Sequence, residues 1–354
     1  MKRFLLILAI VQNLAAMSSQ AARASFEEKG YPFYSKKIEF VWAAPTNQLA
    51  AMVRVFKPIP SKFSASVVSN LIVLSGFTDQ ERTFTTYQGE KLSKDVVAFR
   101  SKDERSSLTI TPGGYAYLYN PDLSDFKKPL EKVPDQKRAY ELGLNILKQL
   151  EIPTDQLITK EDGQIKAWFY PGTRGYFDKA KKEFVEEPDV MGVEFRRRVD
   201  SIYCIRQYVH IQFENREKIT QLEVHWPELQ PVKTWPIASP EQIISWIKEG
   251  RARVQSLEGP TEARWINVVD IKKVTIQEVT IYYDAGDDEA SSRFFFPYAT
   301  LKAEAELSAD DKEAIWLFAP IIKDGLSGVA KKSDGFSVYP STLCEKQRQK
   351  EGGT

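Results

Sequence analysis

Apolar residues recur at helical spacing in three segments of the chain, and strand-like stretches follow each segment. A spacing of three or four residues places side chains on one face of a helix, whereas alternation of apolar and polar residues is typical of a strand. Residues suited to helix ends lie at the ends of these segments, namely Gly76, Asp135 and the Ser239-Pro240 pair. The predicted helices are 61–75, 135–150 and 239–249.

The strand-like stretches predict many short antiparallel strands joined by turns. Pro112-Gly113-Gly114 has the composition of a tight turn between two of them. Residues 171–189 form a charged insertion that is long for a hairpin loop, and we expect it to be exposed. The predicted strands are 38–42, 52–56, 96–99, 107–110, 115–119, 165–170, 190–199, 201–205, 208–213, 219–226, 274–283, 294–306 and 314–319. A short helix that begins at Ser308 is the alternative to the last of these strands.

A helix followed by antiparallel strands therefore occurs three times along the chain. A helix packed on one face of an antiparallel sheet buries the apolar faces of both, which is a common α+β arrangement. We predict an α+β fold of repeated helix-on-antiparallel-sheet units. The expected division is a signal peptide at 1–24, an N-terminal α+β domain at 25–130, a second α+β domain at 131–330, and a polar tail at 331–354.

The N-terminus has the order of features found in an export signal. Two basic residues follow the first Met, the apolar run 4–16 comes next, and Ala22-Arg23-Ala24 has the form of a cleavage site. The run is shorter than the roughly 20 residues of a membrane-spanning helix. We expect cleavage near Ala24, membrane contact only during export, and a secreted or periplasmic protein. A buried N-terminal helix is the alternative.

The charge balance argues against nucleic acid as a partner. The chain has 49 Lys and Arg residues against 48 Asp and Glu residues, and this net charge of +1 gives no reason to expect the basic surface that phosphate contacts require. The sequence also lacks a phosphate-binding glycine loop, Gly-x-Ser-x-Gly, His-Glu-x-x-His and Cys-x-x-Cys. We therefore predict no cofactor and no enzymatic activity.

The two cysteines leave two states open. Cys204 lies in a predicted strand and Cys344 lies in the polar tail. Because an exported protein can keep a disulfide, one long-range bridge is the first alternative. Two free thiols are the second, since domains of this size bury enough core without a covalent link.

Both histidines of the chain lie on one predicted hairpin. Its two apolar sets share a face only if Ile211 lies opposite Leu222, because a slip of one residue would expose one set. This register places His210 opposite Glu223, with His225 diagonal to His210 on the same polar face. Two histidines and a carboxylate are suitable metal ligands, but an exposed polar sheet face is the simpler interpretation.

Arg197 is a candidate of a different kind. Alternation places it on the strand face of Phe195 and Val199, while Arg196 and Arg198 point the other way. An arginine that points into the core needs a carboxylate partner. A structural ion pair is the simpler interpretation, and contact with an anion or a C-terminal carboxylate is the functional one.

Aromatic residues are frequent, and Tyr115, Tyr117 and Tyr119 alternate along one predicted strand. Such residues line grooves for a peptide or a glycan, although they also form ordinary cross-strand pairs. We assign no catalytic and no metal-ligating residue. The candidate binding residues are Arg197, His210, Glu223 and His225.

Three stretches, in this order, resemble the PepSY-like modules of extracytoplasmic proteins, in particular the YycH/YycI-type accessory proteins of bacterial envelope signalling. The first runs from Phe195-Arg-Arg-Arg-Val-Asp200 to the end of the hairpin at Trp226. The second is the helix start Ser239-Pro-Glu-Gln, and the third runs from Val279-Thr-Ile-Tyr-Tyr283 to Trp316-Leu-Phe-Ala-Pro320. The resemblance covers about residues 130–322 and identifies 131–330 as a PepSY/YycI-like domain.

The resemblance implies a cystatin-like helix-on-sheet fold and a non-catalytic role, either regulating a membrane kinase or inhibiting or chaperoning a peptidase. This chain departs from the family in two ways. The regulators keep their N-terminal helix as a membrane anchor, whereas we expect this chain to lose its N-terminal segment by cleavage. A propeptide module precedes a protease, and no protease domain follows here. We expect an exported, non-catalytic binding or regulatory protein that engages an extracytoplasmic protein or peptide. The alternatives are a secreted metal-dependent hydrolase that uses His210, Glu223 and His225, and a peptidase inhibitor.

Overall fold

The computed structural model describes residues 31–33, 37–46, 49, 51–59, 62–121, 132–178, 182–249, 252–255, 271–284, 295–308 and 311–322. The predicted signal peptide, the predicted polar tail and Cys344 lie outside these residues. The chain divides into two compact units. The central unit is Phe56–Pro231, and the terminal unit combines Met1–Val55 with Val232–Thr354. The chain therefore does not pass between units at the predicted boundary of residue 130.

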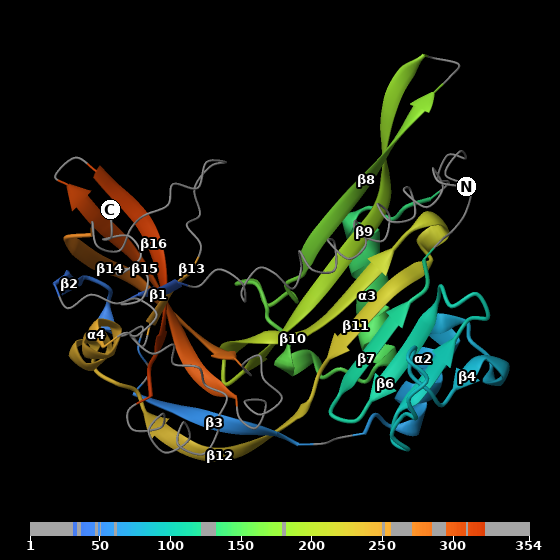
Figure 1. Ribbon diagram of the computed structural model, residues 1–354, viewed down its shortest axis with the longest axis horizontal. Helices are drawn as coiled ribbons and strands as arrows, with labels where there is room; N and C mark the ends of the chain where they lie inside the picture. Colours follow the sequence, from blue (N-terminus) through green and yellow to red (C-terminus); the bar gives the residue numbers. More distant parts are fainter. Residues whose placement is uncertain are drawn as a thin grey trace, which may run out of the picture. The chain divides into compact units, whose positions relative to one another are not determined.

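An antiparallel sheet forms the framework of the central unit, with strands in the order β4, β5, β6, β7, β11, β10, β9 and β8. Figure 1 shows this sheet in cyan to yellow-green. Its strands are β4 (Arg82–Thr83), β5 (Val97–Arg100), β6 (Ser107–Thr111), β7 (Tyr115–Tyr119), β8 (Trp168–Asp178), β9 (Glu183–Val199), β10 (Ile202–Phe213) and β11 (Ile219–His225).

Two helices of the central unit begin where the sequence supplies a capping side chain. The hydroxyl of Ser64 accepts a hydrogen bond from the Val67 amide at 3.2 Å at the start of α2 (Ala65–Ser75). The Asp135 carboxylate accepts one from the Arg138 amide at 2.7 Å at the start of α3 (Gln136–Gln149). α2 ends as predicted at Gly76, whose positive φ of 72° suits a residue without a side chain.

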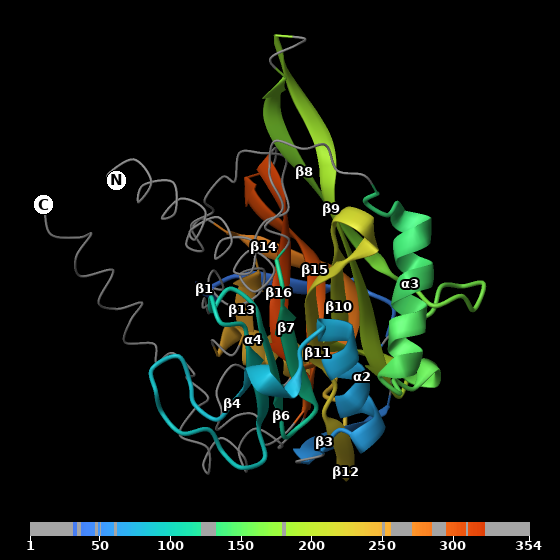
Figure 2. The same ribbon diagram turned by 90° about the vertical axis from the view of Figure 1, so that its right-hand side faces the viewer.

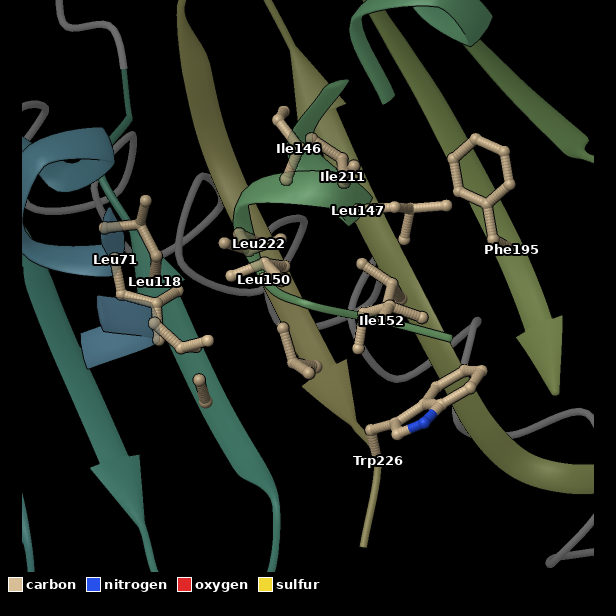
Figure 3. Close-up of a cluster of buried hydrophobic side chains, with 14 of the residues drawn as sticks. Leu71, Leu118, Ile146, Leu147, Leu150, Ile152, Phe195, Ile211, Leu222 and Trp226 are labelled. Atoms are coloured by element: carbon tan, nitrogen blue, oxygen red, sulfur yellow. The ribbon is translucent and has the colours of Figure 1, made fainter. Parts of the chain in front are cut away.

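Both helices pack on the same face of the central sheet and share one core (Figures 2 and 3). Leu71 of α2 and Leu147 of α3 are buried against strand residues such as Leu118 and Leu222. Burial of apolar area of this kind is the main contribution to folding stability. The helices thus cover the middle of one sheet face, where they contact β6, β9 and β10, and the polar residues that alternate with the core residues lie on the opposite face.

In the terminal unit, strands β1, β13, β16, β15 and β14 follow each other in antiparallel order, and β2 pairs with β14 in parallel. Helix α4 (Pro240–Lys248) contacts β16 and begins after Ser239, whose side chain accepts a hydrogen bond from Gln242. β3 (Met52–Ile59) pairs with β12 (Glu228–Pro236). The other strands are β1 (Tyr31–Phe33), β2 (Glu39–Trp42), β13 (Ala252–Gln255), β14 (Lys273–Asp284), β15 (Phe296–Ser308) and β16 (Asp311–Pro320).

The predicted fold of repeated helix-on-antiparallel-sheet units is wrong. Strands make up 53% and helices 19% of the structure, which is therefore a β-rich fold. Two of the three predicted helices share one sheet and one core instead of each covering a sheet of its own. The cystatin-like arrangement implied by the resemblance fails for the same reason. Within the described residues, no helix is both long and apolar enough to cross a bilayer.

The predicted exposed loop at 171–189 is instead a paired hairpin. β8 and β9 pair from Trp168 to Asp178 with one register shift between Gly172 and Thr173, and Figure 1 shows them projecting beyond the neighbouring strands. Arg174 donates to Glu187 across this hairpin at 2.8 Å. Phe177 and Phe184 pair across the two strands and are 60% and 65% exposed. The prediction of exposure was correct for these side chains, but the prediction of a loop was wrong.

Candidate functional site

The hairpin formed by β10 and β11 has the predicted register. Ile211 pairs with Leu222, and His210 pairs with Glu223. Both apolar residues are fully buried in the core beneath the helices. His210 and Glu223 therefore point to the opposite face of the sheet, as the alternation predicts.

This opposite face carries a band of polar and aromatic residues, which we call the polar face. Strand pairing takes the band across five strands, from Trp168 on β8 to Glu194 on β9 and His210 on β10, then to Glu223 on β11 and Tyr117 on β7. A second row on the same face consists of Arg196, Tyr208, His225 and Tyr115.

Arg196 is the centre of the first cluster on the polar face. Its guanidinium donates to the Glu194 carboxylate, to the Tyr203 hydroxyl at 3.2 Å and to the Tyr170 hydroxyl at 3.1 Å. It also lies 4.3 Å from the centre of the Trp168 ring, within the range of a cation–π interaction. Burial is the largest effect on the pKa of Arg196 and lowers it, but Glu194, Tyr203 and Tyr170 together outweigh burial and the pKa is raised. Burial raises the pKa of Tyr203 to about 12.

Glu223 is the centre of the second cluster. Its carboxylate is almost buried and accepts hydrogen bonds from the Tyr208 hydroxyl at 2.9 Å and from the Gln221 amide at 2.7 Å. The Nε2 atom of His225 lies 4.0 Å from the same carboxylate. The His225 ring stacks on Tyr208 and meets the Tyr115 ring edge-on, with ring centres 4.8 and 5.1 Å apart. Glu223 is thus held in place by neutral donors and an aromatic stack.

His210 lies between the two clusters. Its Nδ1 atom is 3.8 Å from the Glu194 carboxylate, and its ring centre is 5.6 Å from that of Tyr170. Burial lowers the pKa of His210, although the carboxylates of Glu194 and Glu223 act in the other direction. The imidazole is therefore neutral near pH 7, where it can donate one hydrogen bond and accept another.

The proposed metal ligands His210, Glu223 and His225 do share the polar face, but they belong to different local clusters. His210 is next to Glu194, whereas His225 stacks on Tyr208 and meets the edge of Tyr115. Among the described residues, no three His, Cys, Asp or Glu side chains are grouped closely enough to hold a metal ion. The metal-dependent hydrolase stays a prediction.

Arg197 points into the core, as predicted, but its surroundings differ from the prediction. Its guanidinium donates to the Gln156 side chain at 2.9 Å, to the Gln207 side chain at 3.1 Å and to the Pro227 carbonyl at 2.6 Å. It also lies 4.9 Å from the Trp226 ring centre. No carboxylate of the described residues pairs with it, so the structural ion pair that the sequence favoured is absent there. Arg197 is separated from the other three candidates by the thickness of the sheet.

The sequence did not reveal that Trp168, Glu194 and Arg196 belong to the polar face. A two-residue turn at Asp200 and Ser201 joins β9 to β10, and an unbroken ladder from that turn would place Arg196 opposite residue 205. The register instead shifts between residues 203 and 208, and Arg196 lies opposite Tyr208. The sequence feature that could have identified Glu194 and Arg196 is the alternation along β9, which places both residues on one face of the strand.

Comparisons with known proteins add little to this description. No protein-family model and no curated protein matches the chain. Among solved structures, the chain is similar to an uncharacterized protein from Eubacterium rectale ATCC 33656, with 14% sequence identity and a TM-score of 0.40. The similarity covers 85% of this chain and 95% of that protein. The PepSY-like assignment has no support from these comparisons and stays a prediction.

Proposed function

We propose that this chain is a non-catalytic binding protein that holds a peptide, or an extended segment of another protein, against the polar face of the central unit. The observation that carries the proposal is the band of aromatic and ionisable side chains across β7, β11, β10, β9 and β8. Tyr, Trp and Arg are enriched among the residues that dominate protein interfaces. The predicted export signal supports a partner outside the cytoplasm.

The aromatic rings of the polar face are accessible to a ligand. Tyr115, Tyr117 and Tyr170 are 39%, 37% and 42% exposed, which is high for residues in the middle of a sheet. Tyrosine supplies a large contact area at a low cost in conformational entropy, because its side chain has few rotatable bonds. The bonds that hold Arg196 and Glu223 reduce the ordering cost of binding further.

The same bonds favour binding over catalysis. Glu194 is engaged by Arg196, and Glu223 accepts hydrogen bonds from Tyr208 and Gln221. A general acid or base must exchange a proton with its substrate, and groups bound in this way are poorly placed to do so. A fixed pattern of donors and acceptors is what recognition of a polar ligand requires.

The proposal is tested by selecting peptides from a random library on the purified chain and measuring the dissociation constant of the tightest binder. We expect Trp168→Ala and Tyr117→Ala each to weaken binding by about tenfold or more, as for central interface aromatics. Phe177→Ala is the matched control, because Phe177 is an exposed aromatic on the projecting hairpin. Loss of binding in the control alone, with both polar-face variants unchanged, would contradict the proposal.

A further inference from the structure

Arg197 carries a positive charge that has no negative partner among the described residues. The residue is 5% exposed, and its Nε and Nη1 atoms donate to Gln156, Gln207 and the Pro227 carbonyl, which are all neutral. Its Nη2 group makes no hydrogen bond to a described residue. Buried charges in proteins are usually paired, because removing an unpaired charge from water is costly. Trp226 lies beside the guanidinium and supplies only a ring face.

Gln207 adds a second unused donor at the same place. Its side chain is 1% exposed, and its Oε1 atom accepts the hydrogen bond from Arg197. Its Nε2 group is buried and has no hydrogen-bond partner in the described residues. Unsatisfied buried donors are rare in native proteins and call for an explanation. Two neighbouring side chains therefore present N–H groups for which the described residues supply no acceptor.

The backbone of β10 is irregular at the segment that presents Gln207. The pairing with β9 shifts between Tyr203 and Tyr208, and Arg206 adopts a positive φ of 63°. Such irregularities redirect side chains and are frequent near functional sites. Cys204 in this segment does not serve as a counter-charge. Burial raises the pKa of its thiol to about 12, against the effect of Arg197, so the thiol is neutral.

We propose that Arg197 and Gln207 form an anion site that binds one carboxylate group. The two oxygens of a carboxylate accept hydrogen bonds from the free N–H groups of Arg197 and Gln207, and its charge neutralises the guanidinium. Burial lowers the pKa of Arg197 to about 10, so the side chain is still charged at pH 7. The carboxylate comes from a small organic acid or from the C-terminus of a peptide. The site lies on the core side of β9 and is independent of the polar face.

The test follows the Nε–Hε nuclear magnetic resonance signal of Arg197, assigned by its loss in Arg197→Lys. Sodium acetate is the first probe, and neutral acetamide is its control. We expect a saturable shift with acetate and none with acetamide. Triglycine with a free C-terminus and its amidated form then distinguish a peptide C-terminus from a small organic acid. A site that admits a peptide end gives a shift with free triglycine and none with the amide. A site that admits only small acids gives a shift with acetate and none with either peptide. The proposal is overturned if neither acetate nor the free peptide gives a saturable shift.

Gln207→Glu supplies a carboxylate from the chain itself and changes few atoms. We expect it to weaken acetate binding at least tenfold and to raise the midpoint of thermal unfolding. Gln156→Glu is the second variant if Gln207→Glu fails to fold, and it should weaken acetate binding several-fold by neutralising the guanidinium from the Nε side. A folded Gln207→Glu protein that binds acetate as tightly as the wild type contradicts the proposed site.

Discussion

His210 and His225 share the polar face, but only His210 is enclosed between two carboxylates. Burial lowers its pKa below the usual 6.5. The unfolded chain therefore takes up a proton at this residue before the folded protein does. The contribution of neutral His210 to the unfolding free energy is complete above about pH 6.5, and it is lost as the pH falls toward the pKa of His210 in the folded state. We expect His210→Gln to reduce the loss of unfolding free energy between about pH 7.5 and about pH 5, as measured by urea denaturation.

His225→Gln is the matched control for this measurement, since it removes the other histidine from the same face. Carboxylates that titrate over this pH range are common to both variants, so the comparison isolates the imidazole. If His210→Gln and the wild type lose the same unfolding free energy on acidification, burial does not control the ionisation of His210.

Cys204 should be chemically silent in the folded protein. It is fully buried, and the raised pKa of its thiol leaves almost no thiolate, which is the reactive form. We expect a Cys344→Ser variant, in which Cys204 is the remaining cysteine, to react with a thiol reagent such as dithionitrobenzoate only after unfolding. A fast reaction of the native variant would show that the core around Cys204 opens readily.

At the scale of elements, α3 lies so close to the sheet that one helical position admits only glycine. A Cβ atom at Gly143 would lie 2.6 Å from the Phe195 ring, and Phe195 is fully buried. Alanine favours a helix by about 1 kcal/mol over glycine, but overpacking of a core costs about 1–3 kcal/mol. We expect Gly143→Ala to lower the unfolding free energy, as measured by chemical denaturation.

Asn145→Ala provides the control, because Asn145 is an exposed position two residues further along α3. Asn145→Ala changes only the helix propensity, and we expect it to raise the unfolding free energy by about 0.5 kcal/mol. Stabilisation by both variants would mean that α3 does not pack as tightly on β9 as the structure indicates.

The sequence was sufficient for the elements that depend on local signals. Asp135 and Ser239 accept the expected capping hydrogen bonds, and the β10–β11 register follows from the need to bury Ile211 against Leu222. It was not sufficient for the irregularity in β10, which contains no glycine and places a positive φ at Arg206. That irregularity decides which β9 residues lie next to His210, so half of the polar face was not predictable.

The projecting hairpin shows a second limit of local signals. Its sequence is charged and contains Gly172 and Gly175, which is typical of a loop. A Cβ at Gly175 would lie 2.1 Å from the Phe184 ring, so the ring lies directly over the glycine in the paired strands. Such aromatic cover over a glycine compensates for the missing side chain in a sheet. This cross-strand contact is not visible in the local pattern of either strand.

For the whole molecule, the elements were predicted better than the fold. The three helices lie close to the predicted ranges. The predicted architecture was nevertheless wrong, because it assumed that each helix packs on a sheet of its own. β9 and β10 have 17 and 12 residues, and long strands make a sheet large enough for α2 and α3 together. The number of helices on a sheet depends on strand pairing between distant segments, which periodicity does not report.

The polar face is also a property of the whole central unit, because five strands contribute to it. The chain has two histidines, and both lie on this face. Their imidazole signals in a long-range proton–nitrogen spectrum therefore report on this face without interference from other histidines. A ligand bound there should shift both signals, whereas a ligand bound elsewhere on the chain should shift neither.

The most direct test of the proposed function records these two signals while the tightest selected peptide, or Zn²⁺, is added to separate samples. We predict that the peptide shifts the signals of both His210 and His225 in a saturable way and that one equivalent of Zn²⁺ leaves them in place. The opposite result, with both signals moved by stoichiometric Zn²⁺ and unaffected by the peptide, would contradict a binding role for the polar face and favour the metal-dependent hydrolase.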